Sequence, residues 1–310
     1  MKKSPKNKQS LRLRPKQSLR LRLKPTLSIV IVSFNTKEVL KDCLSSLKRV
    51  EDEIKFEVIV SDNGSTDGSV QMVKKDFGWA KLFENKKNLG FSRGNNVVRG
   101  KVHGKYILFL NSDTVVYEGT LKKGVEYLEK NKGTGSMTCK ILLPNGELDR
   151  DTRRSFPTPF VALTHFSGLD RLFPKSELLA KYWYSYLPED LEHEVDVVQG
   201  AFHLTRREIL DKVDWFDEDY FLDGEDIDLC WKIRKLGYKI MYFPEVSITH
   251  IKKASKKKSK SSLRVSSGVR AMEIFYRKRL WDRYPFYINY LVILGIKLLL
   301  AIRLVKFYLL

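Results

Sequence analysis

Cysteine is scarce in this sequence, and its spacing excludes the common uses of the few cysteines present. The 310 residues include three, Cys43, Cys139 and Cys230, an odd number scattered along the chain. This pattern matches neither a disulfide framework nor a zinc site. A reducing, cytosolic compartment suits a chain that does not depend on disulfide bonds.

Acidic residues are absent from two strongly basic segments, although the formal net charge of the whole chain is +20. Residues 1–25 carry ten Lys and Arg, residues 251–264 carry seven, and neither segment contains an acid. Residues 265–310 add a net charge of +6, so residues 26–250 stand at −3. A slightly acidic core disfavours a nucleic-acid-binding module. The basic flanks instead suit an anionic surface such as lipid headgroups.

The nucleotide-binding motifs of two common folds are also missing. There is no G-x-G-x-x-G after the first apolar run and no G-x-x-x-x-G-K-[ST] anywhere, so neither a dinucleotide fold nor a P-loop is supported. Apolar strand patterns nevertheless alternate with helical ones. Strands are predicted over residues 27–34, 56–61, 80–83 and 106–110, and helices over 37–49 and up to about 101. This alternation predicts an α/β fold with a doubly wound, mostly parallel sheet.

Each of these strands leads into a polar loop. The loops cover residues 33–35, 62–64, 88–96 and 111–113. Because the carboxyl ends of parallel strands meet at one edge, we expect the loops to share a single cleft. Their Gly, Asn and Ser residues offer backbone amides to phosphate oxygens. The strand over 106–110 delivers Asp113 there, which fits either a ligand site or an Asx turn.

A second acidic cluster begins the helix predicted over residues 225–236. It contains Asp223, Glu225, Asp226 and Asp228. Acids at a helix start are favoured by the helix dipole, and an i, i+4 pair with Lys232 accounts for Asp228. Four acids exceed the need of one helix cap, so we expect at least one to be functional.

The two acidic clusters suit a reaction in which a metal-held diphosphate leaves and a hydroxyl attacks. Asp113 would hold Mg²⁺ or Mn²⁺, hard cations that bind through few carboxylates and substrate phosphates. One acid near Asp226 would then serve as the general base. His250, at a strand end, either completes the metal shell or touches the diphosphate, or else it is a structural histidine.

The middle of the chain is less regular. A strand is predicted over residues 135–143 and a hairpin turn over 144–147. A second strand is predicted over 194–205, where Gly200 and Ala201 interrupt it. A helix over 206–213 and strands over 238–243 and 246–249 are predicted after it. Residues 156–190 are rich in aromatic side chains and are expected as a loop or short helices beside the cleft. They serve either as packing over the core or as contacts to the acceptor.

Five stretches in this order resemble the motifs of family 2 glycosyltransferases with the GT-A fold. The stretches are residues 28–35, 60–68, 88–96, 110–113 and 224–231. The resemblance extends from residue 27 to about 252, and in particular it is to the rhamnosyltransferase-like branch. It implies an inverting transfer of a sugar, with rhamnose as the expected one, from a dTDP- or UDP-linked donor to a saccharide or a lipid-linked saccharide.

The resemblance also implies roles for individual residues. Donor contacts are implied for Ser33, Asn35, Asp62, Asn88, Arg93, Ser112, Asp113, Gly200 and Ala201. Asp226, in the pair with Glu225, corresponds to the base, and Trp231 to a residue on the acceptor side. Asn111 replaces the first acid of the family's D-x-D element, so Asp113 is the one certain carboxylate ligand there. A lysine run follows His250 and is expected either as a lid over the diphosphate or as a solvated loop.

The C-terminal segment, residues 286–310, is apolar but contains Lys297, Arg303 and Lys306. Its uncharged run over 286–296 is shorter than the ~20 residues needed to span a bilayer. We therefore expect an interfacial helix and peripheral attachment to the inner face of the cell membrane, with a helix docked on the core as the alternative.

The expected organisation has four parts. They are a basic tail over 1–25, a GT-A catalytic domain over 26–252, a Lys-rich loop and helical segment over 253–285, and the membrane-associating helix over 286–310. Three other functions stay open: a hexosyl- or galactofuranosyltransferase of the same fold, a non-catalytic sugar-nucleotide or membrane-binding protein, and a nucleic-acid module that uses the basic tails.

Overall fold

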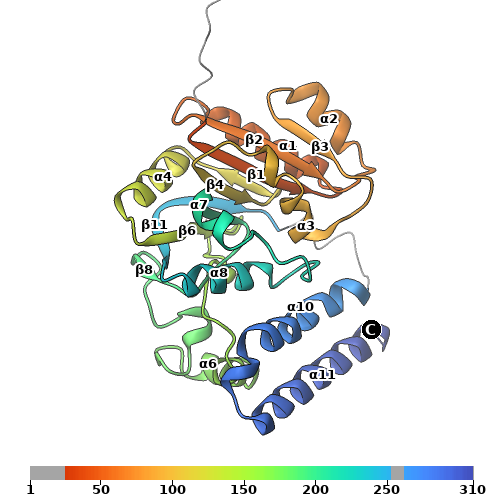
Figure 1. Cartoon of the computed structure of the whole chain (residues 1–310), viewed down its shortest axis with the longest axis vertical. Coiled ribbons are helices and arrows are strands. Elements are labelled where there is room, and N and C mark those ends of the chain that lie inside the picture. The colour runs from red at the N-terminus through yellow and green to blue at the C-terminus, as the bar shows by residue number, and fades with distance from the viewer. Residues whose placement is uncertain (1–24, 253–261, 310) are drawn as a thin grey trace, which may run out of the picture.

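The computed structural model describes residues 25–252 and 262–309 of the chain. The expected basic tail, apart from Pro25, lies outside the described residues, and so do residues 253–261 of the expected lysine run over 251–264. The remaining chain forms a central sheet covered by helices on both faces, with further helices gathered at one end (Figure 1).

The N-terminal half of the sheet is parallel, as predicted. It has the order β3-β2-β1-β4. The strands are β1 (Leu27–Ser33), β2 (Phe56–Asp62), β3 (Lys81–Glu84) and β4 (Tyr106–Leu110). β1 and β4 are continuous apolar runs because both of their faces are buried.

The other half of the sheet is mixed. β10 (Phe202–Arg206) lies antiparallel between β4 and β6 (Thr134–Leu142), and β6 lies parallel to β11 (Lys239–His250). β5 (Thr114–Val116) and β8 (His193–Glu194) both pair antiparallel with β11. The parallel arrangement therefore holds for β1–β4 and for the pair of β6 with β11.

Two strand boundaries differ from the prediction. The expected strand over 194–205 consists of β8, β9 (Val197–Val198) and β10, and β9 pairs with β7 (Arg153–Arg154) in a separate two-stranded sheet. The two strands expected around Pro244 are one, β11, whose register shifts between Phe243 and Ser247. Proline has no N–H to donate to the ladder, so the strand continues past it only with this irregularity.

Helices pack against both faces of the sheet, which confirms the doubly wound arrangement. On one face are α1 (Lys37–Arg49), α2 (Ser69–Asp76) and α4 (Thr120–Lys130). On the other are α7 (Arg207–Lys212), α8 (Glu225–Lys235) and α10 (Ser262–Phe275). The short α3 (Gly90–Asn96) contacts β1 and β2 beside the ends of these strands. The sheet is thus fully covered, and what it leaves open is the edge where the strands end.

Residues 156–190 form short helices joined by loops, so both of the expected forms occur. They are α5 (Pro159–Phe166), α6 (Leu169–Leu172) and a 3₁₀ turn over Lys181–Trp183. α6, α10 and α11 (Phe286–Leu309) lie at the end of the molecule away from β2 and α2 (Figure 1). A π-helical turn, Tyr276–Leu280, and a 3₁₀ turn, Trp281–Arg283, connect α10 to α11.

α11 packs side by side with α10 rather than standing apart from the domain. Tyr276 Oη donates to Asn289 Oδ1 at 2.7 Å, and Lys297 pairs with Glu273 at 2.8 Å. Within the described residues, one stretch, Phe286–Tyr308, is long and apolar enough to cross a membrane, judged by length and composition. Little of it is buried in the protein.

Candidate functional site

A cavity of about 870 Å³ opens at the edge where β1, β2 and β4 end. Asn35, Asn63 and Asn88 line it from the loops after the strands, and Asn111, Ser112 and Asp113 from the loop after β4. The start of α8, the end of β11 and residues 199–201 close the other sides. The volume is in the range of sites for small organic ligands. Loops far apart in the sequence therefore meet in one cleft, as their polar composition predicts.

Two of the expected donor-binding residues lie beneath the lining. Asp62 is buried and accepts hydrogen bonds from Ser65 N at 2.8 Å and Ser65 Oγ at 2.6 Å. Ser33 is buried against Thr36, with 3.0 Å between the two hydroxyl oxygens. Both side chains brace the loops that carry the asparagines.

Asparagine side chains dominate this end of the cavity. Asn35 has a positive φ of 54° and accepts from Thr66 N at 2.8 Å. Asn63, which sequence reasoning did not single out, donates to Gly90 O at 2.9 Å. Asn88 accepts from Gly90 N at 2.9 Å. These bonds fix the loops while the side chains still border the cavity.

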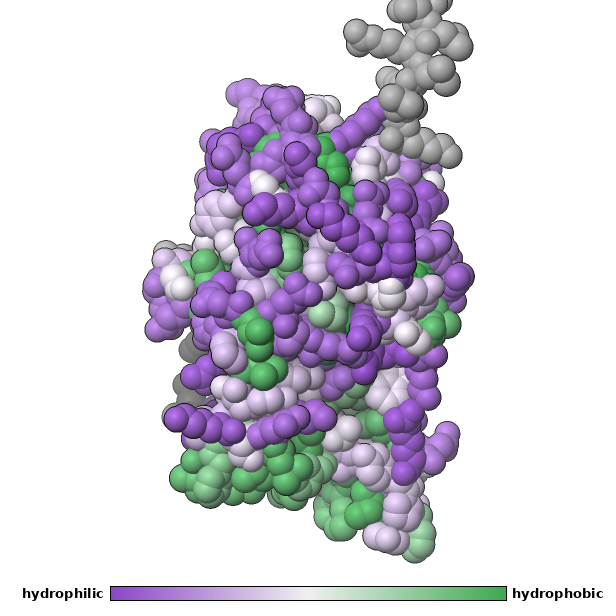
Figure 2. Space-filling view, turned by 90° about the vertical axis from the view of Figure 1, so that its left-hand side faces the viewer, coloured by the Kyte–Doolittle hydropathy of each residue, from purple (hydrophilic) through white to green (hydrophobic). Residues whose placement is uncertain are grey.

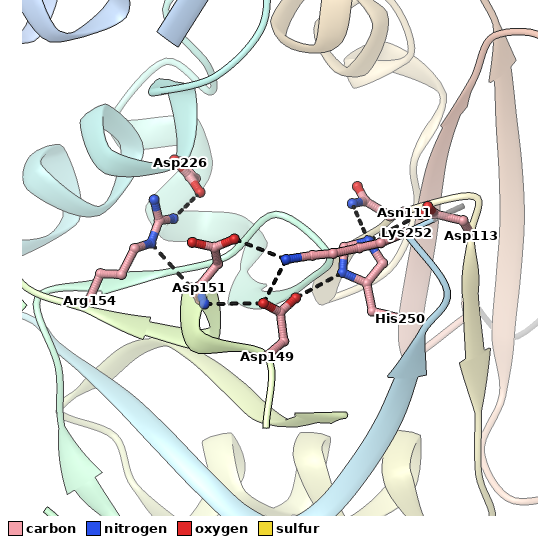
Figure 3. A network of polar contacts seen from close by, with 8 residues as sticks. All are labelled: Asn111, Asp113, Asp149, Asp151, Arg154, Asp226, His250 and Lys252. Carbon is pink, nitrogen blue, oxygen red and sulfur yellow. Dashed lines mark hydrogen bonds and ion pairs between the residues drawn. The ribbon is translucent and has the colours of Figure 1, made fainter. Parts of the chain in front are cut away.

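Asp113 contacts His250 on the side of the cavity away from these asparagines. Asp113 Oδ1 is 3.2 Å from His250 Nε2, and His250 Nδ1 is 3.1 Å from Asp149 Oδ2 (Figure 3). Backbone pairing brings them together, because His250 faces Thr114 in the ladder of β5 and β11, and Ile251 N donates to Asp113 O at 2.8 Å.

The cluster joins three acidic side chains, Asp113, Asp149 and Asp151, to two basic ones, His250 and Lys252. Lys252 Nζ lies 2.7 Å from Asp149 Oδ1 and 3.0 Å from Asp151 Oδ2. Burial acts to lower the pKa of His250, but the bonds to Asp113 and Asp149 outweigh it and raise this pKa to about 9. Burial acts to raise the pKa of Asp149, yet His250 and Lys252 lower it to about 2. His250 and Asp149 are therefore both charged at neutral pH.

Asp113 and His250 are the expected ligands of a hard divalent cation, and the protonated His250 would have to release a proton before its Nε2 could bind one. Such a cation needs few protein ligands when substrate phosphates and water supply the rest. Among the described residues, no group of three or more His, Cys, Asp or Glu side chains is placed to hold a metal ion by itself. A cation here would depend on a phosphate-bearing ligand for the rest of its shell.

Asp226 faces the cavity from the first turn of α8. Its Oδ1 accepts from Ile227 N at 2.8 Å, and its Oδ2 accepts from Arg154 Nη2 at 2.5 Å (Figure 3). Arg154 Nε also donates to the backbone carbonyl of Asp151 at 3.2 Å. The segment 149–154 thus touches Asp226 at one end and His250 at the other.

The other acids of this cluster have different surroundings. Asp228 is fully buried and receives two hydrogen bonds from Arg279, at 2.6 and 3.1 Å. Asp223 accepts from Ser267 Oγ at 2.7 Å. Glu225 lines the cavity, and its Oε2 has no hydrogen-bond partner among the described residues. Burial, followed by the charges of Asp226 and Asp223, raises the pKa of Glu225 well above its usual value.

The turn before α8 depends on a glycine. Asp223 and Gly224 have φ values of 67° and 83°, in the left-handed region. A Cβ on Gly224 would lie 2.7 Å from the Cβ of Ala271 in α10. Glycine therefore lets α10 pack close to the start of α8 and aims the first turn at the cavity.

Two expected contacts do not reach the cavity lining. Arg93 pairs with Glu218 at 3.1 Å on the outside of the domain. Trp231 packs against Phe156 and Phe275, with ring centroids 4.8 and 5.6 Å away, and Arg283 lies over its ring. Gly200 and Ala201 do line the cavity.

Sequence reasoning missed Asp149, Asp151 and Arg154, which join the two ends of the site together with Lys252, a residue of the expected lysine run. The available signal was composition: five of the six residues from 149 to 154 are charged, directly after the predicted hairpin turn. Lys252 stands two residues after His250. Neither pattern predicts which residues form ion pairs with these charged side chains.

Comparison with known proteins adds to this geometry. A model of the family described as "Glycosyl transferase family 2" matches residues 28–214. The chain is 27% identical over 231 residues to rhamnosyltransferase WbbL of Escherichia coli K12, covering 72% of this chain and 82% of that protein. It is 26% identical over 237 residues to an N-acetylglucosaminyl-diphospho-decaprenol L-rhamnosyltransferase of Mycobacterium tuberculosis, covering 73% and 76%.

Solved structures share the fold at lower identity. The mannosyltransferase PcManGT from Pyrobaculum calidifontis, in complex with GDP-Man and Mn²⁺, superposes with a TM-score of 0.56 at 18% identity, over 83% of this chain and 65% of that one. GalNAc-T7 with UDP, GalNAc and Mn²⁺ gives a TM-score of 0.56 at 16% identity, over 82% and 49%.

Proposed function

The chain belongs to glycosyl transferase family 2 and is a glycosyltransferase with the GT-A fold, and on this premise we propose that it transfers rhamnose with inversion. The proposed donor is dTDP- or UDP-linked, and the acceptor is a saccharide or a lipid-linked saccharide. The observation that carries the proposal is that Asp113 and Asp226 line the same cavity and are connected through segment 149–154 (Figure 3). The names of two relatives, both rhamnosyltransferases, support the choice of sugar.

Asp226 is the proposed general base. Each carboxylate oxygen has two lone-pair sites, so Asp226 can accept from an acceptor hydroxyl while it keeps its bonds to Ile227 and Arg154. As the hydroxyl oxygen bonds to the anomeric carbon, its proton passes to Asp226 and the bond from that carbon to the diphosphate oxygen breaks. Attack on the face opposite the leaving group inverts the configuration.

The diphosphate is placed at the other end of the cavity. Asp113 and His250 would hold Mg²⁺ or Mn²⁺, which when bound neutralises the leaving diphosphate. Lys252 lines the same part of the cavity and offers an ammonium group to phosphate oxygens. Asn35, Asn63 and Asn88 are left to contact the nucleoside.

Substitution of the base tests the mechanism. Asp226→Asn should lower transfer by roughly 10²–10⁴-fold because no group remains to take the hydroxyl proton. Donor binding should survive, since Asp226 is not among the proposed donor contacts. Asp219→Asn, on an exposed surface loop, is the matched control. Transfer at the wild-type rate in the Asp226 variant would remove this residue from the mechanism.

A panel of nucleotide sugars, each with and without Mn²⁺, separates the remaining candidates. Nucleotide release with dTDP-rhamnose supports the proposal. Release with a hexosyl or galactofuranosyl donor alone would favour the second candidate, for which a 23% identical poly-beta-1,6-N-acetyl-D-glucosamine synthase of Staphylococcus epidermidis gives a reason. Release with no donor at all would favour a non-catalytic binding protein.

We also propose that α11 lies in the interface of a membrane, on its cytoplasmic face. Its middle is paired with α10 through Lys297 and Glu273, and Glu273 also pairs with Arg277 of the turn that follows α10. A helix held in this way lies along the domain and turns its apolar side chains outward. Tyr287, Tyr290, Leu294, Leu298 and Val305 are exposed on it at helical spacing.

A further inference from the structure

A second group of apolar side chains is exposed away from α11. We call it the α5–α6 surface. It consists of Phe160, Leu163, Phe166, Leu172, Phe173 and Leu178. Leu163 is 64% exposed and Leu172 is 69% exposed, although both are large hydrocarbon side chains. Soluble proteins rarely leave so many neighbouring apolar groups in water, so such a surface marks a contact with a partner.

The α5–α6 surface and α11 share one end of the molecule. α6 and α11 both lie at the end opposite α2 and β3 (Figure 1). Figure 2 shows hydrophobic side chains gathered at that same end, below a largely hydrophilic body. Phe156, three residues before α5, stacks on Phe275 of α10, with ring centroids 6.1 Å apart. The segment that leads into α5 therefore packs on α10, the helix against which α11 also packs.

Cationic side chains lie on both surfaces. Lys297, Arg303 and Lys306 lie on α11, and Arg171 and Lys175 lie within the α5–α6 surface, together with one exposed acid, Glu177. Phenylalanine and leucine with a fringe of lysine and arginine are what an anionic bilayer surface takes up, because the rings and chains enter the acyl region while the cations stay at the headgroups. A bilayer is also an extended partner that can cover two separate surfaces at once.

We propose that the α5–α6 surface is a second membrane contact, which enters the same anionic leaflet as α11. This inference rests on the proposed attachment through α11 and adds the orientation of the domain. With both surfaces in the membrane, the domain is oriented so that β1, β2 and β3 lie away from the bilayer. The cavity, which Ser267 of α10 also lines, then lies just above the helices that touch the membrane. A lipid-linked acceptor reaches it from the bilayer side.

Flotation with vesicles tests the proposal on the full-length chain. The vesicles contain phosphatidylcholine with phosphatidylglycerol. The double variant Leu163→Ser, Leu172→Ser should bind at least roughly tenfold more weakly than wild type, because each leucine that leaves the hydrocarbon loses burial. The matched control is Trp79→Ser, an exposed aromatic residue between α2 and β3, at the other end of the molecule. It should bind like wild type.

A second set of variants separates this contact from α11. If Leu291→Ser, Leu294→Ser abolishes flotation while the α5–α6 double variant floats like wild type, α11 anchors the protein alone and the second contact is refuted. Wild type that does not float at all refutes the membrane attachment together with this inference, while nucleotide release still tests glycosyl transfer separately. A dimer that the α5–α6 variant splits without loss of flotation would assign the surface to a second copy.

Depth labelling gives an independent measurement. The cysteines Cys43, Cys139 and Cys230 are buried, so a fluorophore attaches selectively to an introduced surface cysteine. An environment-sensitive fluorophore on Leu172→Cys should shift to the blue when vesicles are added, and one on Trp79→Cys should not. Equal emission with and without vesicles at position 172 would overturn the proposal.

Discussion

Replacing Arg154 by methionine removes the guanidinium from Asp226 but keeps a long side chain. The two paired side chains are only 12% and 10% exposed. Breaking one partner of a fully buried ion pair costs about 3–5 kcal/mol. Because Asp226 borders an open cavity, water can replace part of the lost hydrogen bonding, and we expect a loss of about 1–3 kcal/mol in the free energy of unfolding. In a chain of this size that lowers Tm by roughly 2–5 °C.

The same substitution should affect turnover more than donor binding. Arg154 holds one oxygen of the proposed base, and a small displacement of a reacting group lowers the rate by up to about 10²-fold. We therefore expect kcat to fall by roughly 10–100-fold, with the KM for the donor little changed. Nucleotide release under saturating acceptor measures both constants.

A double-mutant cycle decides whether the two residues act together. Arg154→Met and Asp226→Asn should destabilise the protein by less in combination than the sum of their separate effects. Arg150→Met, in the same segment but exposed, is the control and should leave Tm and kcat unchanged. Strictly additive losses, or an Arg154 variant with wild-type kcat, would refute the role given to this ion pair.

Two further predictions concern the start of α8. Glu225→Gln should raise Tm at neutral pH. Folding raises the pKa of Glu225, so its protonated carboxyl group stabilises the folded protein below the pKa it has in the unfolded chain. This stabilisation is lost as the pH rises through the pKa of Glu225 in the folded protein. The Tm difference between variant and wild type should therefore grow from acidic to neutral pH in thermal denaturation, and a constant difference would contradict this assignment. Gly224→Ala should lower Tm by more than Gly146→Ala, because both have positive φ but only at Gly224 would the Cβ meet a neighbour. An equal decrease in Tm in the two glycine variants would show that Ala271 can move aside for the added Cβ at little cost.

Much of the donor end of the site was predictable from the sequence. The apolar runs of β1, β2 and β4 are followed directly by polar loops, and the ends of parallel strands must meet at one edge. This local rule placed Asn35, Asn88 and Asp113 around one cavity without any knowledge of distant contacts. It could not separate side chains that line the cavity from those beneath it. Asp62 and Ser33 turn into the loops, where they hydrogen-bond to the hydroxyl groups of Ser65 and Thr36.

The base end shows the limit of such reasoning. Residues 226 and 228 are two apart on a helix, about 200° around its axis, so when one faces the cavity the other faces inward. Which of them does so depends on Arg279, which binds Asp228, and on Arg154, which binds Asp226. These partners are 51 and 72 residues away.

The sequence by itself determined the alternating strands and helices, the family motifs and the strand-end cleft, because each follows from a pattern within a few residues. Only the tertiary structure decided that β10 lies antiparallel between β4 and β6, and that segment 149–154 joins His250 to Asp226. The exposed α5–α6 surface likewise emerged only from the packed chain, since a leucine pattern does not say which side chains other elements cover. Long-range packing chooses among partners that local patterns leave equivalent.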